Sequence, residues 1–229
     1  MTIEQTHPLD QQAVDDGGHR RRLPPEERRA EIFDAALAVF SELGYDQATL
    51  NDVVERVGVS KGCLYHHFSS KEQLLLELIR VRLGCASDDE DESAETKEGS
   101  RNEVLRARLD AIWEHFQKPG QLDLMTLAIN ESTKIPEAGR VLFDEVVARK
   151  RETLRQALTR GKMCGAVSDT DIEMAALMIP WMVMGVALGV HQFRRIDPLK
   201  LSPDEVGKAV TSMILNGIGG VCAEEPETP

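Results

Sequence analysis

Apolar residues recur every three or four positions along most of the chain, and this spacing restricts the fold more than any other feature. One such run is Ile32, Ala36, Val39, Phe40 and Leu43. It has the spacing of a helix with one buried face, whereas the apolar–polar alternation typical of β-strands is absent from the sequence. Glycine and proline separate these runs and predict where helices end. We therefore expect an all-α protein of about nine helices without an internal repeat.

The expected helices are short near the N-terminus and longer after it. Pro24-Pro25 opens a helix that Gly44 ends. Thr49, with Asp52 completing a capping box, starts a short helix. Two more start at Ser60 and Ser70. Longer helical patterns follow at about 101–118, 121–134, 136–163, 169–194 and 202–222.

The negative charge of the chain is concentrated in two segments. The net charge is −12, but residues 1–19 carry four acidic residues with no Lys or Arg, and residues 84–100 carry seven with one Lys. Residues 20–83 hold ten acidic and ten basic residues. A neutral region can still bind DNA if its bases gather on one face, because phosphate contact is local. We expect residues 87–100 to be mobile or a solvated helix extension.

Cysteine usage and the N-terminus indicate a cytoplasmic protein. The four cysteines have no pairable spacing and form no CxxC, which is typical of a reducing compartment. They are Cys63, Cys85, Cys164 and Cys222. The polar, acidic N-terminus does not resemble a signal peptide. The uncharged run Met174–Phe193 approaches the length of a membrane span. Because it contains Pro180 and two glycines and follows three acidic residues, we interpret it as a buried interface helix and expect no membrane association.

Two short helices joined through Val57–Ser60 have the dimensions of a helix-turn-helix. Gly58 stands where the chain must reverse, and small or β-branched apolar residues pack the helices together. The second helix would stay exposed and lie in a major groove. A tight corner between helices in an unrelated protein needs the same glycine and the same apolar face. The pattern alone therefore leaves both interpretations open.

The wider sequence carries a more specific signal. Residues 49–76, TLNDVVERVGVSKGCLYHHFSSKEQLLL, closely resemble the DNA-binding signature of the TetR/AcrR family, as does the preceding helix from Ile32 to Tyr45. The resemblance covers residues 26–80. Val54 and Val57 stand where alanine is usual in the family, and Cys63 stands where threonine or alanine is usual. Residues 121–165 more loosely resemble the ligand-binding half of AcrR-like members.

The resemblance implies a helix-turn-helix DNA-binding domain at 23–70 and a larger effector-binding and dimerisation domain at 71–222. A flexible arm (1–22) and a flexible tail (223–229) would flank them. It also implies a homodimeric repressor that a small molecule releases from a palindromic double-stranded operator. We expect the dimer to form through Met174–Phe193 and Val206–Val221, whose apolar surfaces and glycines suit close helix packing. The alternative is a dimeric helical protein that binds a small molecule or a partner and keeps the module only as a scaffold.

The resemblance assigns DNA contacts to one set of residues: Thr49, Ser60, Lys61, Gly62, Cys63, Tyr65, His66 and Lys71. Lys61 would read a base edge or contact a phosphate, two roles left open. Tyr65 would contact phosphate, with core packing as the alternative. Lys71 lies in the first turn of a predicted helix, where its positive charge interacts unfavourably with the helix dipole. This placement is explained if the lysine binds a phosphate. Arg20–Arg22 are expected to be a solvated tail rather than a minor-groove arm.

Catalytic and metal-binding motifs are absent from the sequence, so we expect neither an enzyme nor a cofactor or metal. The isolated His115 and His191 are expected to be helix-surface or core residues. Some of the aromatic and aliphatic residues on the later helices would line an effector pocket: Trp113, Phe116, Met125, Ile129, Met163, Met178, Trp181 and Met182. Because no dense set of charges lies among them, the effector is expected to be apolar or aromatic.

Overall fold

The computed structural model describes residues 24–84, 101–160, 169–193, 196 and 200–219. All secondary structure in these ranges is helical, which confirms the all-α prediction. The helices join into nine continuous rods over the described residues, because η1 continues α4, and η2 joins α8 to α9. Their bounds are α1 (Pro25–Leu43), α2 (Leu50–Val57), α3 (Lys61–His67), α4 (Lys71–Ile79), η1 (Arg80–Gly84), α6 (Arg101–Gln117), α7 (Gln121–Glu131), α8 (Pro136–Arg140), η2 (Val141–Val147), α9 (Ala148–Arg160), α10 (Asp169–Phe193) and α11 (Pro203–Gly219).

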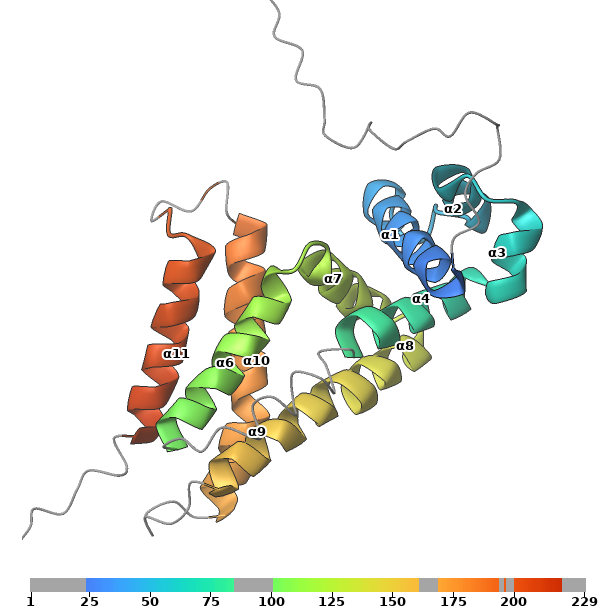
Figure 1. Ribbon diagram of the computed structural model, residues 1–229. Helices are drawn as coiled ribbons and strands as arrows, with labels where there is room; N and C mark the ends of the chain where they lie inside the picture. Colours follow the sequence, from blue (N-terminus) through green and yellow to red (C-terminus); the bar gives the residue numbers. More distant parts are fainter. Residues whose placement is uncertain (1–23, 85–100, 161–168, 194–195, 197–199, 220–229) are drawn as a thin grey trace, which may run out of the picture.

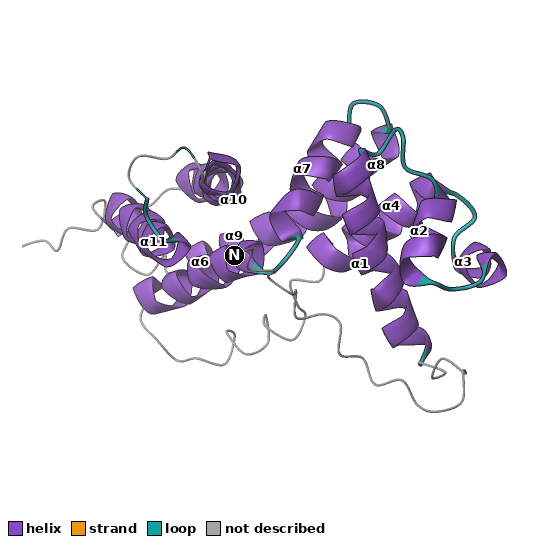
Figure 2. Cartoon of the chain, turned by 90° about the horizontal axis from the view of Figure 1, so that it is seen from above, coloured by secondary structure: helices purple, strands orange, loops and turns teal. Residues whose placement is uncertain are grey.

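The first three helices gather at one end of an elongated molecule, and α6, α10 and α11 gather at the other (Figures 1 and 2). The rod α8–η2–α9 runs between the two ends (Figure 1). Buried apolar residues form one continuous core from Ile32 in α1 to Leu215 in α11. The two halves therefore share a core, with α4 packed on α1 as well as on α7 and α8.

The N-terminal helices begin and end close to the positions predicted from their capping residues. Glu26 and Glu27 occupy the first turn of α1, where acidic side chains stabilise the helix dipole. The buried face of α1 includes Ile32, Phe33 and Phe40. The helix ends at Gly44 with φ of 76°, a conformation that L side chains rarely adopt.

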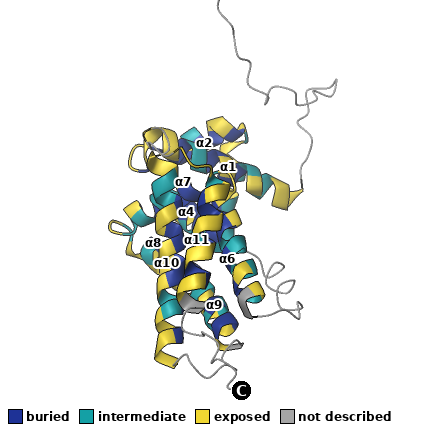
Figure 3. Ribbon diagram, turned by 90° about the vertical axis from the view of Figure 1, so that its left-hand side faces the viewer, coloured by how far each residue is buried: buried dark blue, intermediate teal, exposed yellow. Residues whose placement is uncertain are grey.

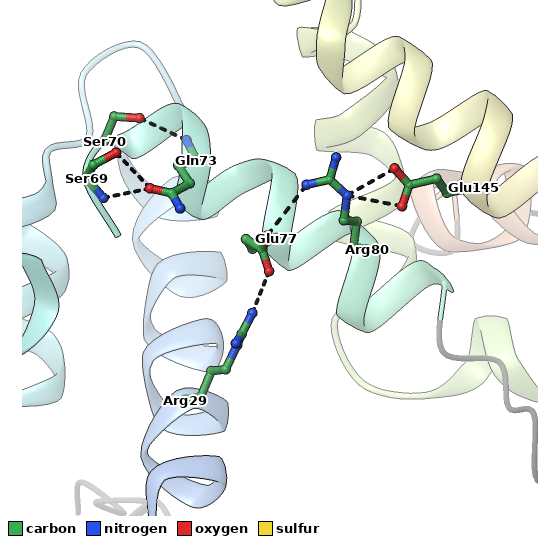
Figure 4. Close-up of polar contacts among 7 residues, drawn as sticks. All are labelled: Arg29, Ser69, Ser70, Gln73, Glu77, Arg80 and Glu145. Carbon is green, nitrogen blue, oxygen red and sulfur yellow. Dashed lines mark hydrogen bonds and ion pairs between the residues drawn. The ribbon is translucent and has the colours of Figure 1, made fainter. Parts of the chain in front are cut away.

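A chain of ion pairs joins α1, α4 and η2 on the surface (Figure 4). Glu77 binds Arg29 of α1 at 2.5 Å on one side and Arg80 at 3.6 Å on the other. Arg80 also binds Glu145 of η2 at 3.0 Å. Exposed ion pairs of this kind contribute little individually. Together, however, they connect the rod formed by α4 and η1 to α1 on one side and to η2 on the other.

Helices α6 and α11 approach each other closely at the far end. A Cβ built on Gly207 would lie 2.4 Å from Trp113 Nε1, so the contact requires glycine. Nearby, the Thr211 hydroxyl donates to Asp110 at 3.0 Å. This face of α6 is therefore closed by α11.

Helix α10 buries one face and exposes another. Ile172, Ile179 and Val183 point into the core. The opposite face carries exposed apolar residues: Met174, Met178, Trp181, Met182, Val186 and Phe193. Figure 3 looks onto this end of the molecule, where exposed surface follows α10 and α11. By length and composition alone, α10 is the one described helix that could cross a membrane, yet its inward face is part of the protein core.

Several predictions fall on residues that the structure does not describe. These are the arm at 1–22, the acidic run at 87–100, the tail at 223–229 and Met163. In the described ranges the predicted long helices agree with α6, α10 and α11 to within a few residues. The pattern at 121–134 ends earlier, because residues 132–134 form a turn after α7.

Candidate nucleic-acid interface

The N-terminus of α2 is closed by a complete capping box. The Thr49 hydroxyl oxygen accepts from the Asp52 amide at 3.3 Å, and the Thr49 amide donates to the Asp52 carboxylate at 2.7 Å. The Thr49 hydroxyl also donates to Asp52 at 2.7 Å. These bonds hold the pKa of Asp52 below its ordinary value. Thr49 lies exposed at a helix start, where a phosphate could bind, but a phosphate there would share Thr49 with Asp52.

The turn between α2 and α3 depends on Gly58. Its φ of 68° and ψ of 36° are left-handed, and its amide donates to the Val54 carbonyl at 2.8 Å. Two residues later, Ser60 caps α3 by accepting from the Cys63 amide at 3.2 Å. The chain therefore reverses within a few residues and starts a second short helix, as a helix-turn-helix requires.

Helix α3 presents a polar face to solvent. Leu64 and the following Phe68 are buried and fix the helix on the core. Tyr65 is 49% exposed, so the core-packing alternative for this side chain is wrong. The predicted contact residues on this outer face are exposed except for Cys63, which is half-buried: Ser60, Lys61, Gly62, Cys63, Tyr65 and His66.

Gly62 lies on the open side of α3. A Cβ at this position would meet no atom within 4 Å, so nothing inside the chain requires glycine here. The structure therefore gives Gly62 no role within the chain. Close approach of DNA at Gly62, or a glycine simply tolerated in a short helix, both stay open as interpretations.

Lys71 is placed differently from the other predicted contacts. Its Nζ donates to the carbonyl oxygens of Tyr45 at 2.5 Å, Ala48 at 2.8 Å and Asp46 at 3.3 Å. The same ammonium lies 4.4 Å from the centroid of the Tyr45 ring. The structure therefore gives Lys71 a role within the chain: it holds the α1–α2 turn that carries the Thr49 cap.

The same turn is held from the second half of the protein. Lys134, between α7 and α8, binds Asp46 at 2.8 Å and Glu131 at 3.3 Å. Its bond to Asp46 lowers the pKa of that carboxyl. Tyr45 beside them is buried, and burial, with Glu72, Glu131 and Asp46 nearby, raises the pKa of its phenol to about 12. Lys134 and Asp46 are 88 residues apart in sequence, and no local pattern could have paired them.

Three further contacts connect α7, η1 and α1. The side-chain amide of Gln121 donates from Nε2 to the backbone carbonyl of Arg82 at 2.9 Å, and the Arg82 guanidinium binds Asp34 of α1 at 2.5 Å. At Gly120 a Cβ would lie 2.7 Å from Leu37 Cδ2, so α7 begins directly against α1. A displacement of α7 would therefore also displace α1 and the turn that follows α1.

The residues predicted to line an effector pocket separate into two groups. Trp113, Phe116 and Met125 are buried and Ile129 is half-buried in the core of the second half. In contrast, Met178, Trp181 and Met182 are exposed on the outer face of α10. In the single chain these three side chains do not line an interior pocket, so the expectation for them was wrong. Because α10 is apolar on two faces, its periodicity could not show which face is buried. No group of His, Cys, Asp or Glu suited to a metal occurs in the described part of the chain.

Comparisons with known proteins agree with this architecture. Residues 32–78 match the model for bacterial regulatory proteins of the tetR family. Residues 103–215 match the model for the C-terminal domain of AefR-like transcriptional repressors. The solved FadR transcriptional regulator of Bacillus subtilis, in complex with stearoyl-CoA, has the same fold with a TM-score of 0.67 at 20% identity, over 82% of this chain and 98% of FadR.

Two curated relatives extend the comparison. The transcriptional activator FasR of Mycolicibacterium smegmatis is 36% identical over 46% of this chain, and the match spans about half of FasR, 48% of its length. The transcriptional repressor AcnR of Corynebacterium efficiens is 30% identical over 70% of this chain and 80% of AcnR. With both family models matched and the helix-turn-helix in place, the chain belongs to the TetR family of bacterial transcriptional regulators.

Proposed function

We propose that this protein is a homodimeric repressor that binds a palindromic operator with α3 in the major groove and leaves it when a small effector binds the second half. The observation that carries the proposal is the exposed polar face of α3, held in place by the Gly58 turn and the Ser60 cap. Lys61 and Gly62 lie at its start, where base edges are read, and Tyr65 lies where it would contact phosphate. Repression agrees with the name of AcnR.

The second copy of the chain would cover the outer face of α10. A patch of apolar side chains this extensive marks an interaction surface in a protein of this kind. Gly185 and Gly189 lie in the same row, and a Cβ at either would meet nothing within 4 Å. Such positions let a partner helix approach closely, which suits a four-helix arrangement of two α10 and two α11 helices around a two-fold axis. Met178, Trp181 and Met182 are assigned to this interface.

Effector control would act through the contacts between the halves. FadR in its solved form carries stearoyl-CoA, which joins an apolar acyl chain to a polar, anionic carrier. This supports an effector with a long apolar part here. Binding beside α6 and α7 would shift α7 against Leu37 and Lys134 against Asp46. In a dimer, a shift of each α1–α2 turn changes the separation of the two α3 helices, so they no longer fit successive grooves.

The experiment measures operator binding directly. Fluorescence anisotropy with the DNA upstream of the protein's own gene, beside a scrambled duplex, should give tight binding to the first only. The double variant Lys61→Ala/Tyr65→Ala should lose at least about tenfold in affinity. Arg140→Ala on α8 removes one positive charge from an exposed position outside α3 and outside the proposed interface, and it should bind like the native protein. Equal affinity of all three proteins for both duplexes would contradict the proposal and favour the scaffold alternative.

A further inference from the structure

His115 is a buried histidine whose ring nitrogens both lack a partner. It lies in the last turn of α6 and is 2% exposed. Neither Nδ1 nor Nε2 has a hydrogen-bond partner. The other histidines in the described ranges, His66, His67 and His191, all reach solvent. His191 also binds Asp123 at 2.9 Å. Only His115 combines full burial with two unused polar atoms in this part of the chain.

This arrangement is unfavourable unless another molecule uses it. Burial, with the charges of Lys150 and Lys118, lowers the pKa of His115 to about 3. The ring is therefore neutral at pH 7 and offers one N–H donor and one acceptor nitrogen. Each buried polar atom left unpaired costs about 1–3 kcal/mol. A phenylalanine or leucine would fill the same core position without that cost.

The position of the ring on α6 indicates where such a molecule would lie. Trp113, two residues earlier, faces α11, and the Gly207 contact closes that side. Residues two apart on a helix point about 200° away from each other. His115 therefore faces away from α11, on the side where Lys150 of α9 is near enough to affect its pKa. The ring of Phe116 lies edge-on beside it, with centroids 5.9 Å apart.

The charges near His115 define the chemistry that fits. Lys118 and Lys150 both disfavour a positive charge at the imidazole, and the same potential favours an acceptor or an anion there. Phe116 beside it belongs to the apolar core. We propose that His115 is the polar anchor of the effector site and donates its N–H to the carbonyl or carboxylate of an otherwise apolar molecule, such as a fatty acid or its ester. This inference rests on the proposed function, because it names the chemistry that the effector must have.

The test uses the full-length protein and three probes with the same twelve-carbon chain: dodecanoate, methyl dodecanoate and dodecyltrimethylammonium. The two carbonyl compounds should bind the native protein, and the cation should bind at least tenfold more weakly. Dodecanoate binding tighter than its methyl ester assigns the carboxylate as the recognised group, and the reverse assigns the ester carbonyl. Octanoate and hexadecanoate extend the series to other chain lengths. Failure of every carboxylate and ester in the series to bind would overturn the inference.

Variants of His115 separate recognition from a role in folding. His115→Phe should lose at least tenfold in affinity for the better carbonyl probe, and His115→Gln, which keeps an N–H donor, should recover part of it. Without probe, His115→Phe should be at least as thermally stable as the native protein, because two unpaired atoms are removed. Equal probe affinity in His115→Phe, or a large loss of its stability, would overturn the inference. The ¹⁵N resonances of the ring should also shift when the probe is added. Operator binding, measured on the same native protein, tests the proposed function separately.

Discussion

Lys71 and Tyr45 form a close pair, with the ammonium 4.4 Å from the centroid of the ring and bonded at 2.5 Å to the tyrosine's own carbonyl oxygen. A lysine in the first turn of α4 is unfavourable for the helix dipole. The carbonyl oxygens and the ring face of the α1–α2 turn compensate for this by stabilising the positive charge. The pair thus joins the start of α4 to the segment that leads into the helix-turn-helix.

We expect Lys71→Met to act mainly on stability. It keeps most of the side-chain stem and removes three bonds from a charged donor, so the free energy of unfolding should fall by about 1–3 kcal/mol. Operator affinity should fall as the turn loosens, while its dependence on salt stays nearly unchanged. Urea denaturation and anisotropy at several salt concentrations measure both effects. Unchanged stability, together with a salt slope lower by roughly two per dimer, would assign Lys71 to phosphate instead.

Lys61 and Tyr65 should respond differently to salt. Tyr65→Phe removes a hydroxyl but no charge, so affinity should fall on both operator and scrambled DNA while the salt slope barely moves. Lys61→Ala should weaken operator binding more than scrambled binding, by about 1–3 kcal/mol, if the ammonium reads a base edge. Equal losses on both duplexes, with a slope lower by roughly two per dimer, would make Lys61 a phosphate contact. Arg140→Ala is the matched control.

The sequence predicted features that depend on neighbouring residues. The caps at Thr49, Ser60 and Ser70 and the turn at Gly58 were found correctly, because each requires particular residue types at fixed short spacing. The direction of the Lys71 side chain was not predictable, since the carbonyls that it binds lie 23 to 26 residues earlier.

The second half shows the same difference between local and distant information. The helix ranges followed from periodicity, but α10 is apolar on two faces, so the pattern could not separate the core side from the side at Met178 and Trp181. His115 was expected to be an ordinary surface or core residue. Its burial depends on how α9 and α6 come together, and no local signal distinguishes it from the exposed His191.

Val186→Arg should separate the proposed dimer. Val186 lies on the outer face of α10 and is 38% exposed, so the single chain can accommodate arginine, whereas a charge buried in a helix interface without a partner is strongly unfavourable. Sedimentation should report a monomer, and operator affinity should fall sharply. Phe143→Arg, at an exposed position on η2, is the control and should stay dimeric. Ile214 is buried in the single chain and would report unfolding instead. A Val186→Arg protein that stays dimeric would exclude this face as the interface.

The pH dependence of stability should reveal His115. Its pKa is about 3 in the folded protein and close to the ordinary value of about 6.5 in the unfolded chain. Above pH 6.5 both states are neutral at this site, and the full stability is present. As the pH falls below 6.5, the unfolded state binds a proton at this histidine and the folded state does not. The free energy of unfolding should therefore decrease by up to about 1.4 kcal/mol per pH unit. His115→Phe should lack this decrease, and His191→Phe should retain it. Urea denaturation of the three ligand-free proteins at pH 7.5, 6.0 and 5.0 makes the comparison. If the free energy of unfolding changes with pH in the same way for the native protein and for His115→Phe, the buried imidazole accepts a proton as readily as an exposed one.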